Sequence, residues 1–169
     1  IKYRQPYKPK KTIAITGTNG KTSTAWYLAQ ICKINKINTK LTGTLGYYKN
    51  LKKIKNTTLT TPSNLDLYQF AYSNKKNNNF FISEASSHGL HQGRLKDLEV
   101  DIAAITNISR DHLDYHKNFA SYIKSKFLLF TDVLKNNGTA VVNSRLNNYK
   151  NLEKKLLIKR IKIITYGSK

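Results

Sequence analysis

The chain has 169 residues and a mass of 19.4 kDa, and 30 Lys and Arg against 9 Asp and Glu give it a formal net charge of +21. Hydrophobic residues make up 39% of the chain, enough for the core of one ordinary domain, so its composition does not force disorder. A single cysteine, Cys32, excludes an internal disulfide framework and a cysteine-based zinc site, and no stretch reaches the ~18 apolar residues of a membrane span.

The elements expected in the first half of the chain begin after a linker at residues 1–10. A β-branched run predicts a buried strand at 12–16, and this strand ends in a glycine turn at 17–20. Apolar residues at helical spacing then predict a helix at 21–34. The remaining expectations in this half are a strand at 40–48, a polar connection at 49–58 and a helix from 62–63 through 70.

The second half continues the alternation of strands and helices. The expected elements are a strand at 80–82, a polar segment at 83–94, a strand at 101–105, a helix at 122–134, a turn at 136–138, a strand at 139–142, a helix at 147–157 and a strand at 161–166. Short apolar strands that alternate with helices predict an α/β fold with a mostly parallel sheet and helices on both faces.

The high positive charge has two interpretations. Lysine outnumbers arginine 25 to 5, and the lysines are scattered through the expected helices, loops and strand ends. Surfaces that bind nucleic acid usually gather basic residues on one face and use arginine for bidentate contacts. The composition therefore favours a lysine-rich solvated surface over a specific nucleic-acid interface, which stays open as an alternative.

The segment Gly17-Thr18-Asn19-Gly20-Lys21-Thr22 lies between an expected strand and an expected helix. Glycines let backbone N–H groups converge on phosphate oxygens, and a helix N-terminus favours negative charge. Lys21 would reach the terminal phosphates, and the Thr22 hydroxyl would bind magnesium. The strict pattern G-x-x-x-x-G-K-[ST] is not met, because Ile15 stands where it requires glycine. The segment thus predicts a shortened phosphate-binding loop in a P-loop NTPase-like fold, rather than a plain turn.

Two further clusters follow expected strands. Glu84 opens the segment 84–90 and suits either a magnesium ligand at the carboxyl end of a strand or the cap of a helix. The segment 106–116 holds two of the four histidines, and a histidine here is either a metal ligand or a hydrogen-bonded structural residue. Lys126 lies in an apolar stretch and, taken alone, resembles a lysine that extends its ammonium to solvent.

Together these segments resemble the Mur ligase family of peptidoglycan assembly, and within it the MurE type. The matching strings are GTNGKTS at 17–23, TTPS at 60–63, EASSHGL at 84–90 with Gln92 and Arg94, and TNISRDHLDYH at 106–116. The resemblance covers residues 11–166 and corresponds to the central ATP-binding domain, so we expect residues 1–10 to link it to an N-terminal domain and 11–169 to form it. The chain begins with Ile1 and contains no methionine, so we expect it to be part of a longer protein that also has a C-terminal domain.

The resemblance implies a role for each matching residue. Residues 17–23 (Gly17, Thr18, Asn19, Gly20, Lys21, Thr22 and Ser23) would bind ATP, with Lys21 on the phosphates. Thr22 and Glu84 would bind one magnesium ion, and His112 would bind a second. Lys126 matches a lysine that carbon dioxide converts to a carbamate, an oxygen ligand suited to magnesium. The positions that would contact the muramoyl-dipeptide substrate are Thr60, Thr61, Ser86, Gln92 and Arg94.

The implied reaction is ATP-dependent addition of a diamino acid, expected to be meso-diaminopimelate, to UDP-MurNAc-L-Ala-D-Glu through an acyl phosphate. ATP and Mg²⁺ are the implied cofactors. We expect a cytoplasmic monomer that binds neither membrane nor a specific nucleic acid. Two alternatives remain open: another amide ligase of the superfamily, such as a folylpolyglutamate synthase, and a basic module that binds nucleotide or nucleic acid without catalysis.

Overall fold

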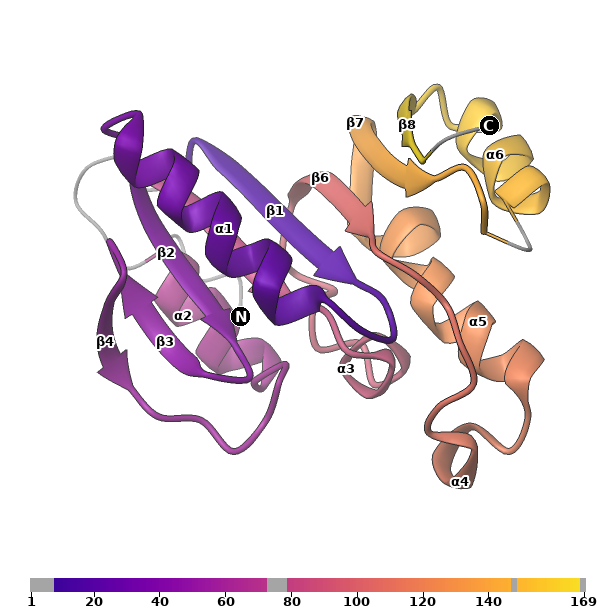
Figure 1. Ribbon diagram of the computed structural model, residues 1–169, viewed down its shortest axis with the longest axis horizontal. Helices are drawn as coiled ribbons and strands as arrows, with labels where there is room; N and C mark the ends of the chain where they lie inside the picture. The colour runs from indigo at the N-terminus through magenta and orange to yellow at the C-terminus, as the bar shows by residue number, and fades with distance from the viewer. Residues whose placement is uncertain (1–7, 73–78, 147–148, 168–169) are drawn as a thin grey trace.

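Eight strands form one sheet in the computed structural model, which describes residues 8–72, 79–146 and 149–167. The strands are β1 (Lys11–Thr16), β2 (Asn38–Gly43), β3 (Gly46–Lys49), β4 (Lys52–Lys55), β5 (Asn79–Glu84), β6 (Val100–Ile105), β7 (Leu134–Asn143) and β8 (Lys162–Tyr166). Their order is β4-β3-β2-β5-β1-β6-β7-β8 (Figure 1). The pairs from β2 to β8 are parallel, and only the β2–β3 and β3–β4 pairs are antiparallel. The mostly parallel sheet predicted from the sequence is confirmed.

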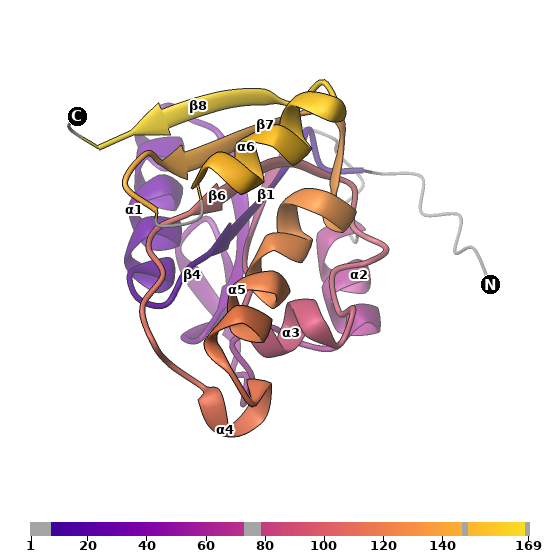
Figure 2. The same cartoon turned by 90° about the vertical axis from the view of Figure 1, so that its right-hand side faces the viewer.

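Helices cover both faces of the sheet, as the sequence predicts (Figure 2). On one face α1 (Lys21–Ile34) packs through Ala25 and Ala29 on a cluster that includes Ile13 and Ile15 of β1. Because side chains of a strand alternate between faces, Ala14 joins the larger core on the opposite face. The helices of that face are α2 (Asn64–Tyr72), α3 (Ser87–His91), α5 (Phe119–Leu128) and α6 (Tyr149–Ile158).

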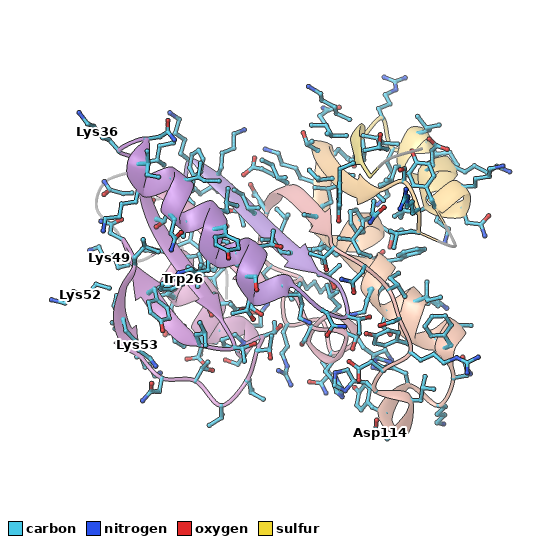
Figure 3. All side chains as sticks on the ribbon, in the orientation of Figure 1. Trp26, Lys36, Lys49, Lys52, Lys53 and Asp114 are labelled. Carbon is cyan, nitrogen blue, oxygen red and sulfur yellow. The ribbon has the colours of Figure 1, made fainter. Side chains whose placement is uncertain are left out.

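The single strand expected at 40–48 is wrong. Gly43 ends β2 and Gly46 begins β3, and the two strands pair antiparallel across the residues between them. The polar connection expected at 49–58 is also wrong in part, because residues 52–55 form β4. All four residues of β4 are exposed, and three of them are lysines. Exposed charges on an edge strand disfavour pairing with another chain, and Lys52 of this strand points outwards (Figure 3).

The helix expected at 122–134 differs in its bounds and in its second half. It begins at Phe119, where Asn118 caps it by accepting a hydrogen bond from the Ser121 N–H, and the α-helix ends at Leu128. Leu129–Val133 is a π-helix, and Leu134 already belongs to β7. The turn expected at 136–138 lies inside β7, where the pairing with β6 shifts register. An apolar periodicity alone does not distinguish an α-helix from the wider π turn that follows it.

The carboxyl ends of the four central strands meet at one edge of the sheet. The segments that leave this edge begin at Thr44 after β2, Ala85 after β5, Gly17 after β1 and Thr106 after β6. This edge is where ligands of open α/β sheets bind. In the part of the chain that the structure describes, no helix is long and apolar enough to span a bilayer. Residues 1–7 of the expected linker and the start of the helix expected at 147–157 lie outside the described residues.

Candidate active site

The glycine turn connects β1 to α1 as predicted. Gly17 has φ 143°, and a Cβ placed on it would lie 1.8 Å from the Thr106 hydroxyl oxygen, so only glycine fits against this neighbour. Gly20 has φ 82° and is the N-cap of α1. The first N–H groups of an α-helix have no partner inside the helix and can bind an anion. The loop therefore offers the N–H groups at the start of α1, next to the Lys21 ammonium, to a phosphate.

Lys21 folds back onto its own loop. Its Nζ donates to the carbonyl oxygens of Gly17 and Thr18, each at 2.9 Å. Burial lowers the pKa of Lys21, and the negative charges of Glu84 and Asp111 partly oppose that shift. The ammonium satisfies two carbonyl groups of the loop here, and a phosphate at the start of α1 would compete with them for its N–H donors.

Thr22 and Glu84 meet between α1 and the end of β5. The Thr22 hydroxyl donates to Glu84 Oε2 at 2.9 Å, and the Thr44 N–H donates to Glu84 Oε1 at 3.0 Å. Glu84 is buried, and the absence of a side chain at Gly43 makes room for it, since a Cβ there would lie 1.9 Å from Oε1. The helix-cap alternative for Glu84 is wrong, because the Ser86 side chain caps α3 by accepting from the Gly89 N–H.

This oxygen pair fits a magnesium ion. Magnesium prefers hard oxygen ligands, and in nucleotide sites it is usually held by one or two protein oxygens together with phosphate oxygens and water. Among the described residues there is no group of three or more His, Cys, Asp or Glu that could hold a metal on its own. The Glu84 carboxylate and the Thr22 hydroxyl would supply two ligands of such an ion, and phosphate oxygens bound at the neighbouring loop would supply others.

Lys126 lies under the same loop. Its side chain is 1% exposed, and its Nζ donates to the Gly17 carbonyl oxygen at 2.8 Å and lies 4.5 Å from the centroid of the Tyr122 ring. The interpretation of Lys126 as a lysine that reaches solvent is therefore wrong. Burial, and next the positive charge of Lys21, lower the pKa of Lys126 to about 7. A substantial neutral fraction of this amine is thus available near pH 7.

His112 lies at the rim of the site. It has φ 51° and a half-exposed side chain, and its Nε2 lies 3.5 Å from Asp111 Oδ2. Its ring centroid is 4.8 Å from that of His88 and 6.4 Å from that of Tyr122, the residue under Lys126. The other three histidines, His88, His91 and His116, each contact the Tyr115 ring, and His112 joins this group through His88. His112 is thus the N-cap of α4 (Leu113–His116), lies beside His88 and Tyr122, and remains accessible.

The residues predicted to contact the muramoyl-dipeptide form a connected hydrogen-bond network. Arg94 donates to the Thr61 carbonyl at 2.6 Å and to the Gln92 side-chain oxygen, and the Gln92 amide donates to the Tyr115 hydroxyl at 3.1 Å. The Thr61 hydroxyl donates to the Glu84 carbonyl, and the Ser86 N–H donates to that hydroxyl. The side chain of Thr61 is completely buried, whereas Thr60 is partly accessible and its hydroxyl lies 3.1 Å from the Thr44 hydroxyl. The network joins this surface to Glu84.

The whole pattern has a counterpart in known proteins. The family model of the Mur ligase middle domain matches residues 15–169. The chain belongs to the Mur ligase family. The UDP-N-acetylmuramoyl-L-alanyl-D-glutamate--2,6-diaminopimelate ligase of Rickettsia bellii is 40% identical over 169 residues, covering 96% of this chain and 35% of that protein.

Solved structures agree with this membership. A structure of a UDP-N-acetylmuramoyl-L-alanyl-D-glutamate--2,6-diaminopimelate ligase superposes with a TM-score of 0.80 and 35% identity, covering 95% of this chain and 32% of that one. A folylpolyglutamate synthase/dihydrofolate synthase from Yersinia pestis, complexed with AMPPNP and a Mn ion, gives a TM-score of 0.68 at 16% identity, over 93% of this chain and 43% of that one. The second likeness shows a shared fold. This Mur ligase chain spans about a third of the length of the curated relatives it matches.

Some residues of this Mur ligase site were not singled out from the sequence. Thr44 binds both oxygens of Glu84 through its N–H and hydroxyl. Asn107 contacts the loop residue Asn19, and the Tyr122 hydroxyl lies 2.9 Å from the Thr18 hydroxyl. Asn107 follows the strand predicted at 101–105, and this position was the available signal, whereas Thr44 lay inside the strand wrongly predicted at 40–48. Their partners are 88 and 40 residues away in the sequence, so only the fold reveals the contacts.

Two buried lysines make the stability of this Mur ligase domain depend on pH. Burial lowers the pKa of Lys126 to about 7 and that of Lys40 to about 8, from an ordinary value of 10.5. At a pH between the folded pKa of each lysine and 10.5, the unfolded chain holds a proton that the folded chain has lost. The free energy of unfolding therefore rises with pH over this range. We expect denaturant unfolding to show this rise from about pH 7 to 9.5, with a slope of at most about 1.4 kcal/mol per pH unit for each lysine.

Methionine variants assign the slope to its source. Lys40→Met is expected to flatten the rise above about pH 8, and Lys126→Met to flatten its lower part from about pH 7. Burial raises the pKa of Tyr47 and Tyr72 to about 12, so their ionisation in the unfolded chain opposes the rise above about pH 10. If the free energy of unfolding instead decreases as the pH is raised from about 7 to 9.5, the lowered pKa values of the two buried lysines are contradicted.

Proposed function

We propose that the chain is the ATP-binding domain of a ligase that joins a diamino acid to UDP-MurNAc-L-Ala-D-Glu. The observation that carries this proposal is the convergence of Lys21, Glu84 and Lys126 around the loop after β1, in a chain 40% identical to a ligase named for this substrate. The names of the relatives favour 2,6-diaminopimelate as the added amino acid. We propose that residues 11–169 form this domain and that residues 1–10 link it to a preceding one.

The proposed reaction brings two anions together. The carboxylate of the D-glutamyl residue attacks the γ-phosphorus of ATP, and the bond to ADP breaks, which gives an acyl phosphate. The amine of the diamino acid then attacks the acyl carbon, loses a proton and expels inorganic phosphate. Positioning and neutralisation of charge supply most of the catalysis in such transfers. Lys21 binds the phosphates through its ammonium, and the N–H groups at the start of α1 complete their binding.

The proposed site holds two magnesium ions, one on each side of the loop. Thr22 and Glu84 would hold one ion, and His112 together with Lys126 would hold the second. As an ammonium Lys126 cannot bind a cation, but its neutral amine can add to carbon dioxide, forming an N–C bond and releasing a proton, to give a carbamate with two oxygens. Bound magnesium supplies neutralisation of the phosphate charge. The pKa of about 7 and the burial of Lys126 support this use of the side chain.

The remaining assignments follow from the substrates. Thr60, Ser86, Gln92 and Arg94 border the network beside Glu84 and would contact the muramoyl-dipeptide, while Thr61 would act by holding Ser86 and Glu84 in place. We place the reaction in the cytoplasm, because ATP and nucleotide-linked precursors are found there, and we propose a monomer. A basic module without catalysis would leave the arrangement of Glu84, His112 and Lys126 without a use.

An acceptor panel tests the proposed function. The full-length protein is incubated with ATP, Mg²⁺ and UDP-MurNAc-L-Ala-D-Glu, and meso-diaminopimelate or L-lysine is added, with release of phosphate and product mass as readouts. Product is expected with meso-diaminopimelate. A parallel reaction with dihydropteroate or folate and glutamate tests the folylpolyglutamate alternative. Turnover only in that reaction, or ATP-independent binding of a defined nucleic-acid site without any ligation, would contradict the proposal.

A further inference from the structure

The loop after β1 is held by the segment that follows the neighbouring strand β6. The Thr106 N–H donates to the Thr16 carbonyl, and the Thr18 N–H donates to the Asn107 carbonyl, each at 3.0 Å. The Thr18 hydroxyl accepts from the Ser109 N–H at 3.0 Å. These bonds extend the β1–β6 pairing beyond the end of the sheet. The loop is therefore fixed along one side before any ligand binds.

The side chain of Asn107 adds a second attachment, to the middle of the loop. Its Oδ1 accepts from the Asn19 N–H at 3.0 Å, and its Nδ2 donates to the Asn19 carbonyl at 3.0 Å. The Thr106 hydroxyl donates to the same carbonyl at 2.6 Å. One amide side chain thus satisfies both backbone groups of Asn19. Asparagine suits this position because a primary amide offers a donor and an acceptor side by side.

This attachment determines what the next residue can offer to a phosphate. In a trans peptide the C=O of one residue and the N–H of the next point in opposite directions. Because Thr106 and Asn107 hold the Asn19 carbonyl, the Gly20 N–H must point away from them. The N–H groups of Thr18 and Asn19 are already paired, which leaves the phosphates with the N–H groups from Gly20 onward. The direction of the Gly20 N–H is therefore set by Thr106 and Asn107 together, and Asn107 is the one that also holds the Asn19 N–H.

We propose that Asn107 is a positioning residue for the nucleotide: by holding the Asn19–Gly20 peptide in one orientation it prepares the loop to bind the phosphates of ATP. The inference rests on the proposed function only in that the loop binds a nucleotide. Without the Asn107 amide only the Thr106 hydroxyl still holds the Asn19 carbonyl. The peptide then has more freedom to rotate, and this freedom must be lost again on binding, which lowers affinity. The effect falls on ATP binding and leaves the acceptor substrates unaffected.

The test compares Asn107→Ala with Asn35→Ala in the full-length protein. Asn35 also uses its side-chain amide on a backbone carbonyl, that of Ile31, but at the opposite end of α1. Isothermal titration calorimetry with ATP and Mg²⁺ is expected to give a Kd about tenfold higher for Asn107→Ala and an unchanged Kd for Asn35→Ala. In the ligation assay, KM for ATP is expected to rise about tenfold, with kcat within about threefold of the original value and KM for UDP-MurNAc-L-Ala-D-Glu unchanged.

A second variant covers a failure of the first to fold. Asn107→Asp keeps the acceptor for the Asn19 N–H and loses the donor to its carbonyl, and it places a negative charge beside the loop. The unfolding temperature of Asn107→Asp is expected to be closer to that of the original protein than the unfolding temperature of Asn107→Ala is. Its Kd for ATP is nevertheless expected to be at least as high as that of Asn107→Ala. If the two substitutions acted only by destabilising the fold, the less stable variant would also be the one that binds ATP more weakly.

The outcomes separate this inference from the proposed function. If the original protein does not bind ATP, the proposed function fails. If it binds ATP and Lys21→Ala weakens that binding, whereas Asn107→Ala and Asn107→Asp bind ATP with the original Kd, the inference is overturned and the proposed function stands. A fall in kcat at an unchanged KM for ATP also overturns the inference, because it would place the effect of Asn107 after nucleotide binding.

Discussion

Replacing Lys21 with alanine is expected to raise the Kd for ATP about 100-fold, which takes binding below detection at ordinary protein concentrations. The ammonium is the cation placed directly at the start of α1, and in the free loop it already satisfies the carbonyl groups of Gly17 and Thr18. Charge-assisted hydrogen bonds to phosphate are stronger than neutral ones, and partial burial reduces their screening by solvent. Titration calorimetry with ATP and Mg²⁺ measures the change directly.

Lys33→Ala provides the matched control for this prediction. Lys33 lies in the last turn of the same helix, is exposed, and is remote from the loop. Its removal changes the net charge by the same amount, so it reports any contribution from the general positive field of the protein. Lys33→Ala is expected to bind ATP with a Kd within about twofold of the original value. Normal ATP binding by Lys21→Ala would refute the assignment of the phosphate-binding loop.

Replacing Lys126 with alanine is expected to reduce kcat of the full-length ligase about 1000-fold. The side chain is buried under the loop, and its Nζ lies within hydrogen-bond distance of the Gly17 carbonyl oxygen. If its carbamate holds a metal ion, the variant loses an oxygen ligand and leaves a space that a small carboxylate can enter. Formate or acetate is therefore expected to restore part of the activity of Lys126→Ala.

Two further variants show whether the loss of activity comes from a missing metal ligand. Lys126→Met fills the space with an apolar side chain, so it is expected to be as inactive as Lys126→Ala and to show no rescue by carboxylates. Lys124→Ala removes an exposed lysine from the same helix and is expected to retain the original kcat. Unchanged turnover in Lys126→Ala would remove Lys126 from the mechanism, and rescue of both variants by salt in general would remove the metal-ligand role.

The fold could be predicted where local signals are strong. The helix at 21–34 has the predicted bounds because an apolar repeat follows a glycine turn. The strand at 52–55 could not be predicted, because its lysine-rich sequence lacks an apolar pattern and its structure depends on pairing with β3. The expected strand at 40–48 missed a reversal between Gly43 and Gly46, since the residues on either side keep a strand-like pattern.

The site was predictable to the extent that its residues lie in contiguous motifs. Lys21 and Thr22 follow β1 through the glycine turn and Glu84 ends β5, and parallel strands bring such positions to one edge. The burial of Lys126 and its contact with Gly17 depend on how α5 packs under the loop, 109 residues away in the sequence. The same holds for Asn107, whose amide could be assigned a role only after its two contacts with Asn19 were visible.

The central claim is that the loop after β1 binds the phosphates of ATP beside a metal ion held by Thr22 and Glu84. A crystal structure of the full-length protein with AMPPNP and Mn²⁺ tests it most directly. The account predicts phosphate oxygens within hydrogen-bond distance of Lys21 Nζ and of the Gly20 N–H, and an anomalous manganese peak beside Thr22 and Glu84. It also predicts that Lys21 has left the carbonyl groups of Gly17 and Thr18. Phosphates bound away from the loop after β1, with the Lys21 ammonium still on these carbonyl groups, would contradict the account.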